Sequence, residues 1–168
     1  MKKIKTYRMS ISRVFPAKHP RAGEKTYFYA QIQNALFPGT EMSMKDGMAK
    51  KLHTIRENYE LWKKRIDEVN TGNAVLVLYE WADKPFRSKT RELFIFDKDS
   101  GISVQKITLG FIDDIASVEE VENEKANYYN INIIAENDGL SEQDFRDWFK
   151  GYDLSAPKAI IQFTKFRY

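Results

Sequence analysis

The sequence contains no cysteine, and this absence excludes several kinds of site at once. Disulfide frameworks, thiolate metal sites and thiol redox chemistry all require cysteine. Histidine is scarce as well, since His19 and His53 are the only two, and no HExxH-like spacing is present. We therefore predict no metal site and no cofactor. A chain without cysteine is typical of a reducing compartment, so we predict a cytoplasmic protein.

Long apolar runs are also missing. The start, MKKIKTYRMSISRVF, is basic but lacks the apolar stretch of a signal peptide. No later segment approaches the roughly 20 apolar residues of a membrane span, so we predict no membrane association. The chain also has no P-loop, no GxGxxG and no GxSxG, which excludes the common signatures of nucleotide hydrolases, dinucleotide-binding enzymes and serine hydrolases.

Neither sign of charge is in large excess. Lys and Arg number 27 against 24 Asp and Glu, so the net charge is only +3, and any contact with nucleic acid must be a local patch. A length of 168 residues with 42% hydrophobic content is enough for one domain, 1–168, with a core.

Three segments have apolar residues at helical spacing, and the same spacing places aromatic residues on the core side. These segments are 25–39, 59–71 and 142–150. Asn58 and Ser141 stand where the second and third helices need an N-cap. Six further segments have the alternation or the apolar, β-branched composition of strands: 7–14, 52–56, 74–81, 87–96, 101–111 and 158–168.

Three local features complete the predicted fold. We expect 87–96 and 101–111 to pair as a hairpin, because a turn around Asp99 and Gly101 joins them. The acidic segment 113–125 is typical of a solvated face or loop. The Met-rich segment 41–50 is expected to cross the surface. The order of elements favours an α+β fold, and a small mixed or antiparallel β-barrel with peripheral helices satisfies it.

The segment Lys51-Leu-His-Thr-Ile-Arg56 is followed by a predicted helix and then by TGNAVLVL. This order resembles the ASCH family of PUA-like domains, in which a K-x-x-T-x-R motif precedes a strand of the form G-D/N-x-hydrophobic. NDGLSEQDFRDWF and AIIQFTKF are similar to the family's late helix and closing strand. The resemblance covers about 50–168 and implies a PUA-like barrel.

The resemblance also implies site residues. In the family's bacterial N4-acetylcytidine amidohydrolases the motif's Lys and Thr and a later carboxylate are catalytic, whereas other members are thought to bind RNA. By position these are Lys51 and Thr54, with Arg56 contacting an anion or a base. The carboxylate is Asp138 if the alignment follows the Ser141 position, or Glu136 if it follows the Glu-Asn pair, and we favour Asp138.

The residues of the motif can also be considered physically. In a regular strand Thr54 and Arg56 point to one face, whereas Lys51 points away unless the backbone bends before the strand. A threonine hydroxyl needs a base, and Lys51 can serve only if burial or a nearby charge lowers its pKa from about 10.4. Arg56 supplies such a charge, and it could instead bind a phosphate. We assign His53 no catalytic role.

A second candidate surface is WADKPFRSKTRE, in which cations alternate with rings. Trp81, Arg87 and Lys89 are its predicted ligand-binding residues, because cations neutralise phosphates and rings stack on unpaired bases. The alternative is a charged edge that only prevents aggregation.

The sequence leaves three functions open. The first is a domain whose cleft binds a nucleotide, a modified nucleoside or single-stranded RNA. The second is a metal-independent amidohydrolase acting on an acylated cytidine, and the third is a protein-interaction domain with a vestigial pocket. The fold does not choose among them, because one scaffold hosts several functions.

Overall fold

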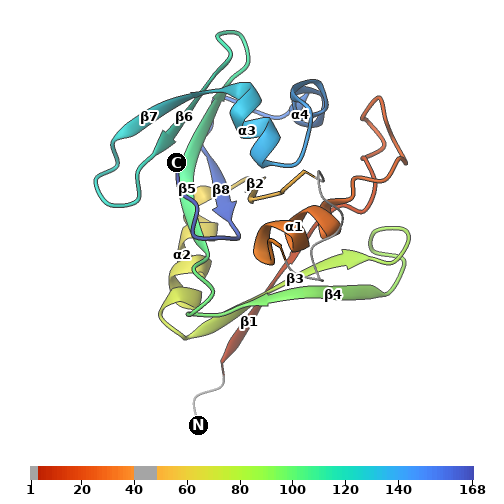
Figure 1. Cartoon of the computed structure of the whole chain (residues 1–168), viewed down its shortest axis with the longest axis vertical. Helices are drawn as coiled ribbons and strands as arrows, with labels where there is room; N and C mark the ends of the chain where they lie inside the picture. The colour runs from red at the N-terminus through yellow and green to blue at the C-terminus, as the bar shows by residue number, and fades with distance from the viewer. Residues whose placement is uncertain (1–3, 40–48) are drawn as a thin grey trace.

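The computed structural model describes residues 4–39 and 49–168, which form two β-sheets and four helices (Figure 1). The helices are α1 (Phe28–Leu36), α2 (Tyr59–Asn70), α3 (Ile131–Asn137) and α4 (Glu142–Phe149). The strands are β1 (Lys5–Ser10), β2 (His53–Arg56), β3 (Ala74–Trp81), β4 (Thr90–Phe96), β5 (Ser103–Gly110), β6 (Ile115–Glu119), β7 (Ala126–Asn130) and β8 (Lys158–Gln162). The α+β class is confirmed.

The closed barrel is not confirmed. Within the described residues the strands form one sheet of order β1-β3-β4 and another of order β2-β8-β5-β6-β7. β1 runs parallel to β3, and every other pairing is antiparallel. The described residues therefore form two separate sheets.

A single hydrophobic core joins the two sheets. β8 lies between β2 and β5, and all five of its residues are buried. α2 bridges the sheets, because Trp62, Ile66 and Val69 face β3 on one side and β5 and β8 on the other. The Asn58 side chain accepts a hydrogen bond from the backbone N–H of Leu61, which confirms the predicted N-cap.

The predicted hairpin is wrong. β4 pairs with β3, with Phe96 opposite Leu76, whereas β5 pairs with β6 and β8. Asp97 still forms the turn expected there, since its side chain accepts hydrogen bonds from the Asp99 backbone and the Ser100 hydroxyl. A turn fixes where the chain reverses but not which strand it then pairs with, and here it carries the chain from one sheet to the other.

The acidic segment 113–125, predicted as a solvated face or loop, is mostly exposed but includes a strand that was not predicted. It contains β6, in which Ala116 and Val118 are fully buried, Ile115 is exposed, and Ser117 and Glu119 are partly buried. Two inward apolar residues are too short a pattern to stand out among carboxylates. β7 and α3 follow without having been predicted, and most of the segment 41–50 lies outside the described residues.

The remaining predicted elements are close to those found. α1 lies within the segment 25–39 in which a helix was predicted, and β3 corresponds to 74–81. The first and last strands are shorter than predicted, ending at Ser10 and Gln162. At α4 the Ser141 side chain accepts a hydrogen bond from the Asp144 backbone, as its capping position predicts.

Candidate functional site

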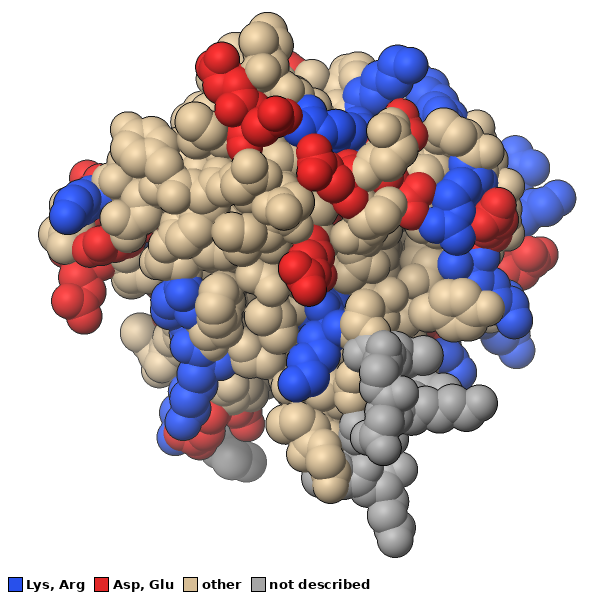
Figure 2. Space-filling view, turned by 45° about the horizontal axis from the view of Figure 1, so that its top comes forward, with Lys and Arg blue, Asp and Glu red and all other residues tan. Residues whose placement is uncertain are grey.

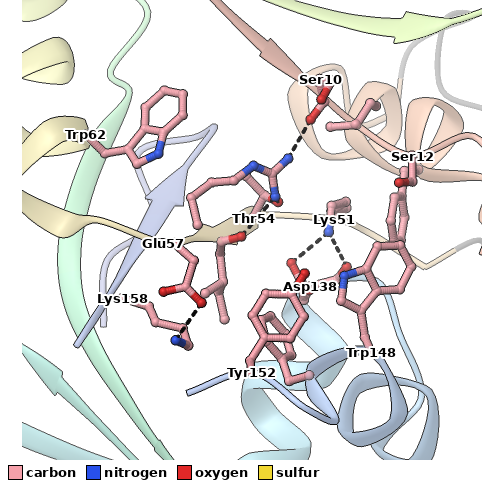
Figure 3. Close-up of a pocket in the computed structure, with 15 residues that line it drawn as sticks. Ser10, Ser12, Lys51, Thr54, Glu57, Trp62, Asp138, Trp148, Tyr152 and Lys158 are labelled. Atoms are coloured by element: carbon pink, nitrogen blue, oxygen red, sulfur yellow. Dashed lines mark hydrogen bonds and ion pairs between the residues drawn. The ribbon is translucent and has the colours of Figure 1, made fainter. Parts of the chain in front are cut away.

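A cavity with a volume of about 400 Å³ lies beside β2 (Figure 3). The end of β1, the first residue of α1, and the segment from α3 to the residues after α4 complete its walls. Its polar side chains include Lys51, Thr54, Arg56 and Asp138. Its aromatic side chains are Phe28, Trp62, Trp148, Phe149 and Tyr152.

Lys51 and Asp138 form a buried ion pair in this cavity. The Lys51 Nζ donates to Asp138 Oδ1 at 2.7 Å and to the Asp138 carbonyl oxygen at 2.6 Å (Figure 3). The two residues are only 1% and 5% exposed. The same ammonium lies 4.0 Å from the centroid of the Phe28 ring, a cation–π distance. Residues 87 positions apart in the sequence thus meet at one point.

The backbone before β2 directs Lys51 into the cavity. The Lys51 N–H donates to the carbonyl of Gln31 in α1, and the Leu52 N–H donates to the carbonyl of Asn137 at the end of α3. The chain is therefore tied to two helices before the strand begins at His53. The bend that the sequence required is present, and it places Lys51 in the same cavity as Thr54.

Gly139 makes the close approach of these segments possible. Its φ is +76°, in the left-handed region that favours glycine. A Cβ at this position would lie 1.8 Å from Gln31 Oε1 and 3.2 Å from Lys51 Cβ. Any other residue at this position would adopt a strained backbone and would displace the Gln31 side chain.

The environment shifts the pKa of both charged partners. Burial lowers the pKa of Lys51, the negative charge of Asp138 opposes that shift, and Arg56 adds to it. Burial raises the pKa of Asp138, but Lys51 and His53 outweigh it and hold that pKa below its ordinary value. Asp138 is thus an anion at neutral pH, and Lys51 loses its proton more easily than a solvated lysine.

Arg56 holds the Thr54 hydroxyl. Its NH1 donates to Thr54 Oγ1 at 2.7 Å and to the Ile55 carbonyl at 2.9 Å, while its NH2 donates to the Ser10 carbonyl at 2.5 Å. Because the Thr54 oxygen accepts a hydrogen bond from Arg56, its own hydroxyl proton can be donated elsewhere. Both outer nitrogens of the guanidinium bind protein groups, so Arg56 orients Thr54 as well as contributing charge.

A buried polar chain behind Asp138 was not predicted. Tyr168 Oη accepts from Asn137 Nδ2 at 2.9 Å and lies 2.8 Å from His53 Nε2. Since the tyrosine oxygen accepts from Asn137, its proton is directed at Nε2, and the ring proton of His53 belongs on Nδ1. That Nδ1 is 3.4 Å from Asp138 Oδ1, longer than an ordinary hydrogen bond, and it has no closer polar partner among the described residues.

Burial lowers the pKa of His53, so the imidazole is neutral at neutral pH. It lies on the face of β2 opposite Thr54, where it is completely buried. The position of His53 on the core-facing side of a predicted strand was the only sequence signal for this buried polar chain. The other members of the chain, Asn137, Asp138 and Tyr168, are far from His53 in the sequence, and no local pattern identifies them.

The structure separates the other predicted site residues from this cavity. Glu136 lines a different hollow, beside Ala49 and Lys50, and Asp138 rather than Glu136 meets Lys51. Trp81, Arg87 and Lys89 lie at the far end of β3 and in the loop before β4. They form no part of the cavity wall.

Aromatic residues expected in the core also line the cavity. Trp62 belongs to the core cluster and is 8% exposed, yet it forms part of the wall. Trp148 packs against Phe28 with ring centroids 5.7 Å apart and is only partly buried. At the rim, the Lys158 Nζ donates to Glu57 Oε1 at 2.9 Å. The helical spacing identified these rings but not the cavity beside them.

Comparison of the chain with protein-family models, curated proteins and solved structures finds no match. Residues 4–39 and 49–168 contain no group of three or more His, Asp or Glu side chains arranged to hold a metal ion. In the same part of the chain, no helix has both the length and the apolar composition needed to cross a bilayer.

Proposed function

We propose that the cavity binds a nucleotide-sized ligand, a nucleotide or a modified nucleoside, and that the chain is an ASCH-type domain. The buried Lys51–Asp138 pair beside aromatic walls is the observation that carries the proposal. A cavity of about 400 Å³ is within the usual range for small-ligand sites. Ring faces suit a planar base, and an ammonium, a carboxylate and a hydroxyl supply the donors and acceptors that read its edge.

The charges of the cavity favour a ligand with little charge of its own. Lys51 is paired with Asp138, and Lys158 is paired with Glu57. Arg56 is the one cation of the cavity wall without a salt bridge to a described residue. One uncompensated positive charge suits a nucleoside or a monophosphate better than a polyphosphate, which requires several.

The resemblance of the Lys51–Arg56 motif to the ASCH family supports the same proposal. The proposal includes a PUA-like arrangement of the strands. The test is calorimetric titration of the protein with nucleosides and mononucleotides. We expect Asp138→Asn to abolish saturable binding and Glu136→Gln to leave it unchanged. The two substitutions each remove one negative charge from the same segment, so equal effects would contradict a site at Asp138.

Amidohydrolysis is a second candidate, because Thr54 and a lysine of lowered pKa share the cavity. Lys51 would first release its ammonium proton to solvent, and the Thr54 oxygen would then attack the acyl carbon of an acylated cytidine as its own proton passes to the Lys51 amine. Lys51 would return that proton to the amino group as the carbon–nitrogen bond breaks. Water would then hydrolyse the threonine ester, releasing the acid and regenerating the hydroxyl.

Incubation with N4-acetylcytidine without added metal tests this candidate. We expect deacetylation by the wild type, none by Lys51→Ala or Thr54→Ala, and partial activity of Thr54→Ser, which keeps a hydroxyl. Binding without turnover would leave the binding proposal alone standing. The absence of both would favour the third possibility, a protein-interaction domain with a vestigial pocket.

A further inference from the structure

The charges of the chain are distributed unevenly. Residues 11–26 and 80–91 together contain eight Lys and Arg and three Asp and Glu, a net charge of +5. The whole chain carries +3, so all other residues together carry −2. We call the cations of these two segments the basic surface: Arg13, Lys18, Arg21, Lys25, Lys84, Arg87, Lys89 and Arg91. A patch with more charge than the molecule as a whole is a local electrostatic feature of the kind that a polyanion requires.

The two segments lie side by side although they are far apart in the sequence. Figure 1 shows both loops on the right-hand side of the molecule, and Figure 2 shows Lys and Arg atoms gathered on that side. The Arg13 guanidinium donates to the Ala82 carbonyl and ties the first loop to the second. Arg13, Lys25 and Arg91 also line one hollow of about 580 Å³. The two segments of the basic surface therefore meet at Arg13, Lys25 and Arg91.

Most of its cations are available to a ligand. All eight are exposed. Arg21 is paired with Glu24 and Asp144, and Arg91 is paired with Glu80. The other six cations form no salt bridge with a described carboxylate: Arg13, Lys18, Lys25, Lys84, Arg87 and Lys89.

Two exposed rings accompany these charges. Phe86 is 87% exposed and Tyr27 is 59% exposed. Both have φ near +60°, a left-handed backbone that is uncommon for bulky residues. The Phe86 ring lies beside the Trp81 ring, and the two ring centroids are 5.2 Å apart. Rings held outward among cations offer stacking faces to unpaired bases.

The basic surface continues into the cavity at Lys51. Phe28 lines both that cavity and the hollow at Arg13. Ser12, in the cavity wall, directly precedes Arg13. A chain of nucleotides could thus extend from the cavity across the start of α1 to the loop at Phe86.

We infer that the basic surface binds the backbone of single-stranded nucleic acid, one nucleotide of which enters the cavity at Lys51. The entry of that nucleotide rests on the proposed function, whereas binding at the basic surface does not. The ligand of the whole surface is then a polynucleotide rather than a free nucleotide. Single strands fit better than duplexes, because only unpaired bases can stack on Phe86 and Tyr27.

The number of cations sets the expected salt dependence. Each phosphate neutralised on a single strand contributes about −0.7 to the slope of log K against log salt. Arg13 already donates to the Ala82 carbonyl. The other five cations without carboxylate partners give a slope of about −3.5, so affinity should fall about 100-fold between about 50 and 200 mM salt. Removing two of these contacts should reduce the slope by about 1.4.

Fluorescence anisotropy with labelled single-stranded RNA and DNA oligonucleotides of one mixed sequence tests the inference. The test variant is Arg87→Glu/Lys89→Glu, and the control is Lys64→Glu/Lys125→Glu, whose side chains are exposed elsewhere on the molecule. Both variants change the net charge by −4, from +3 to −1. We expect the first to weaken binding about 10-fold or more with a shallower salt slope, and the control to change it less than about twofold.

The possible results distinguish this inference from the proposed function. Equal losses in both double variants, or a duplex that binds as tightly as the single strand, would overturn the basic surface as a specific site. Nucleoside binding at the cavity without tighter binding of an oligonucleotide would overturn it too, while the proposed function stands. Oligonucleotide binding that depends on Arg87 and Lys89, in a protein that binds no nucleoside, would retain the basic surface and overturn the entry into the cavity. Comparing the RNA with the DNA oligonucleotide identifies the sugar.

Discussion

Replacing Asp138 by Asn tests the physical basis of the site. Asparagine keeps the volume of the side chain but leaves the Lys51 ammonium without its counter-ion in a buried place. Breaking a buried ion pair by removing one partner costs about 3–5 kcal/mol. Lys51 would still donate to the Asp138 backbone carbonyl, which lies 2.6 Å away, so we expect the lower end of that range, about 3 kcal/mol.

A double-mutant cycle separates the pair from the rest of the site. Lys51→Met removes the ammonium while keeping an unbranched side chain, and Lys51→Met/Asp138→Asn removes both charges. We expect the double variant to be more stable than the sum of the single losses implies, with a coupling of about 2–3 kcal/mol. A neutral pair of similar shape avoids the uncompensated buried charge that each single variant leaves behind.

Urea unfolding followed by tryptophan fluorescence measures each free energy. Trp62 and Trp148 line the cavity and should report its loss. Glu136→Gln is the matched control and should change stability by less than about 0.5 kcal/mol. A loss below about 1 kcal/mol for Asp138→Asn, or no coupling in the cycle, would refute the claim that this pair is buried and charged.

Other predictions concern the groups around the pair. Burial lowers the pKa of His53 below its ordinary value of 6.5, so the unfolded chain takes up the proton first and the free energy of unfolding should fall as pH drops below 6.5. His53→Gln should reduce that slope in urea titrations from pH 7 to pH 5, and an unchanged slope would contradict a neutral buried imidazole. Tyr168→Phe should lower the free energy of unfolding by about 1–3 kcal/mol, because the hydrogen bonds to His53 and Asn137 are both lost. Thermal unfolding measures this loss, and an unchanged stability would contradict the buried polar chain. Gly139→Ala should cost about 2 kcal/mol or more, from the left-handed backbone and the clash with Gln31, and full stability in calorimetry would contradict the close approach.

Local patterns in the sequence predicted the elements better than their partners. The helical spacing and the Asn58 and Ser141 caps located α2 and α4, because capping and periodicity depend on near neighbours in the chain. The pairing of β4 with β3 depends on contacts that a turn at 97–101 does not encode. The strand β6 was missed because the carboxylates around it concealed two buried apolar residues.

The site shows the same division. Alternation in β2 predicted that Thr54 and Arg56 would share a face, and they are hydrogen-bonded to each other. The need for a bend before Lys51 followed from the same alternation. The contacts that create the bend come from α1 and α3, and the partner of Lys51 is Asp138 at the end of α3 rather than Glu136. Such contacts join distant parts of the chain, which periodicity does not connect.

Titration of the protein with nucleosides and mononucleotides, in the wild type, Asp138→Asn and Glu136→Gln, tests the central claim most directly. The proposed site predicts saturable binding at one site in the wild type and in Glu136→Gln, and none in Asp138→Asn once its folded state is verified by circular dichroism. Binding that survives in folded Asp138→Asn, or its absence from the wild type, would contradict a nucleotide-sized ligand at the Lys51–Asp138 pair.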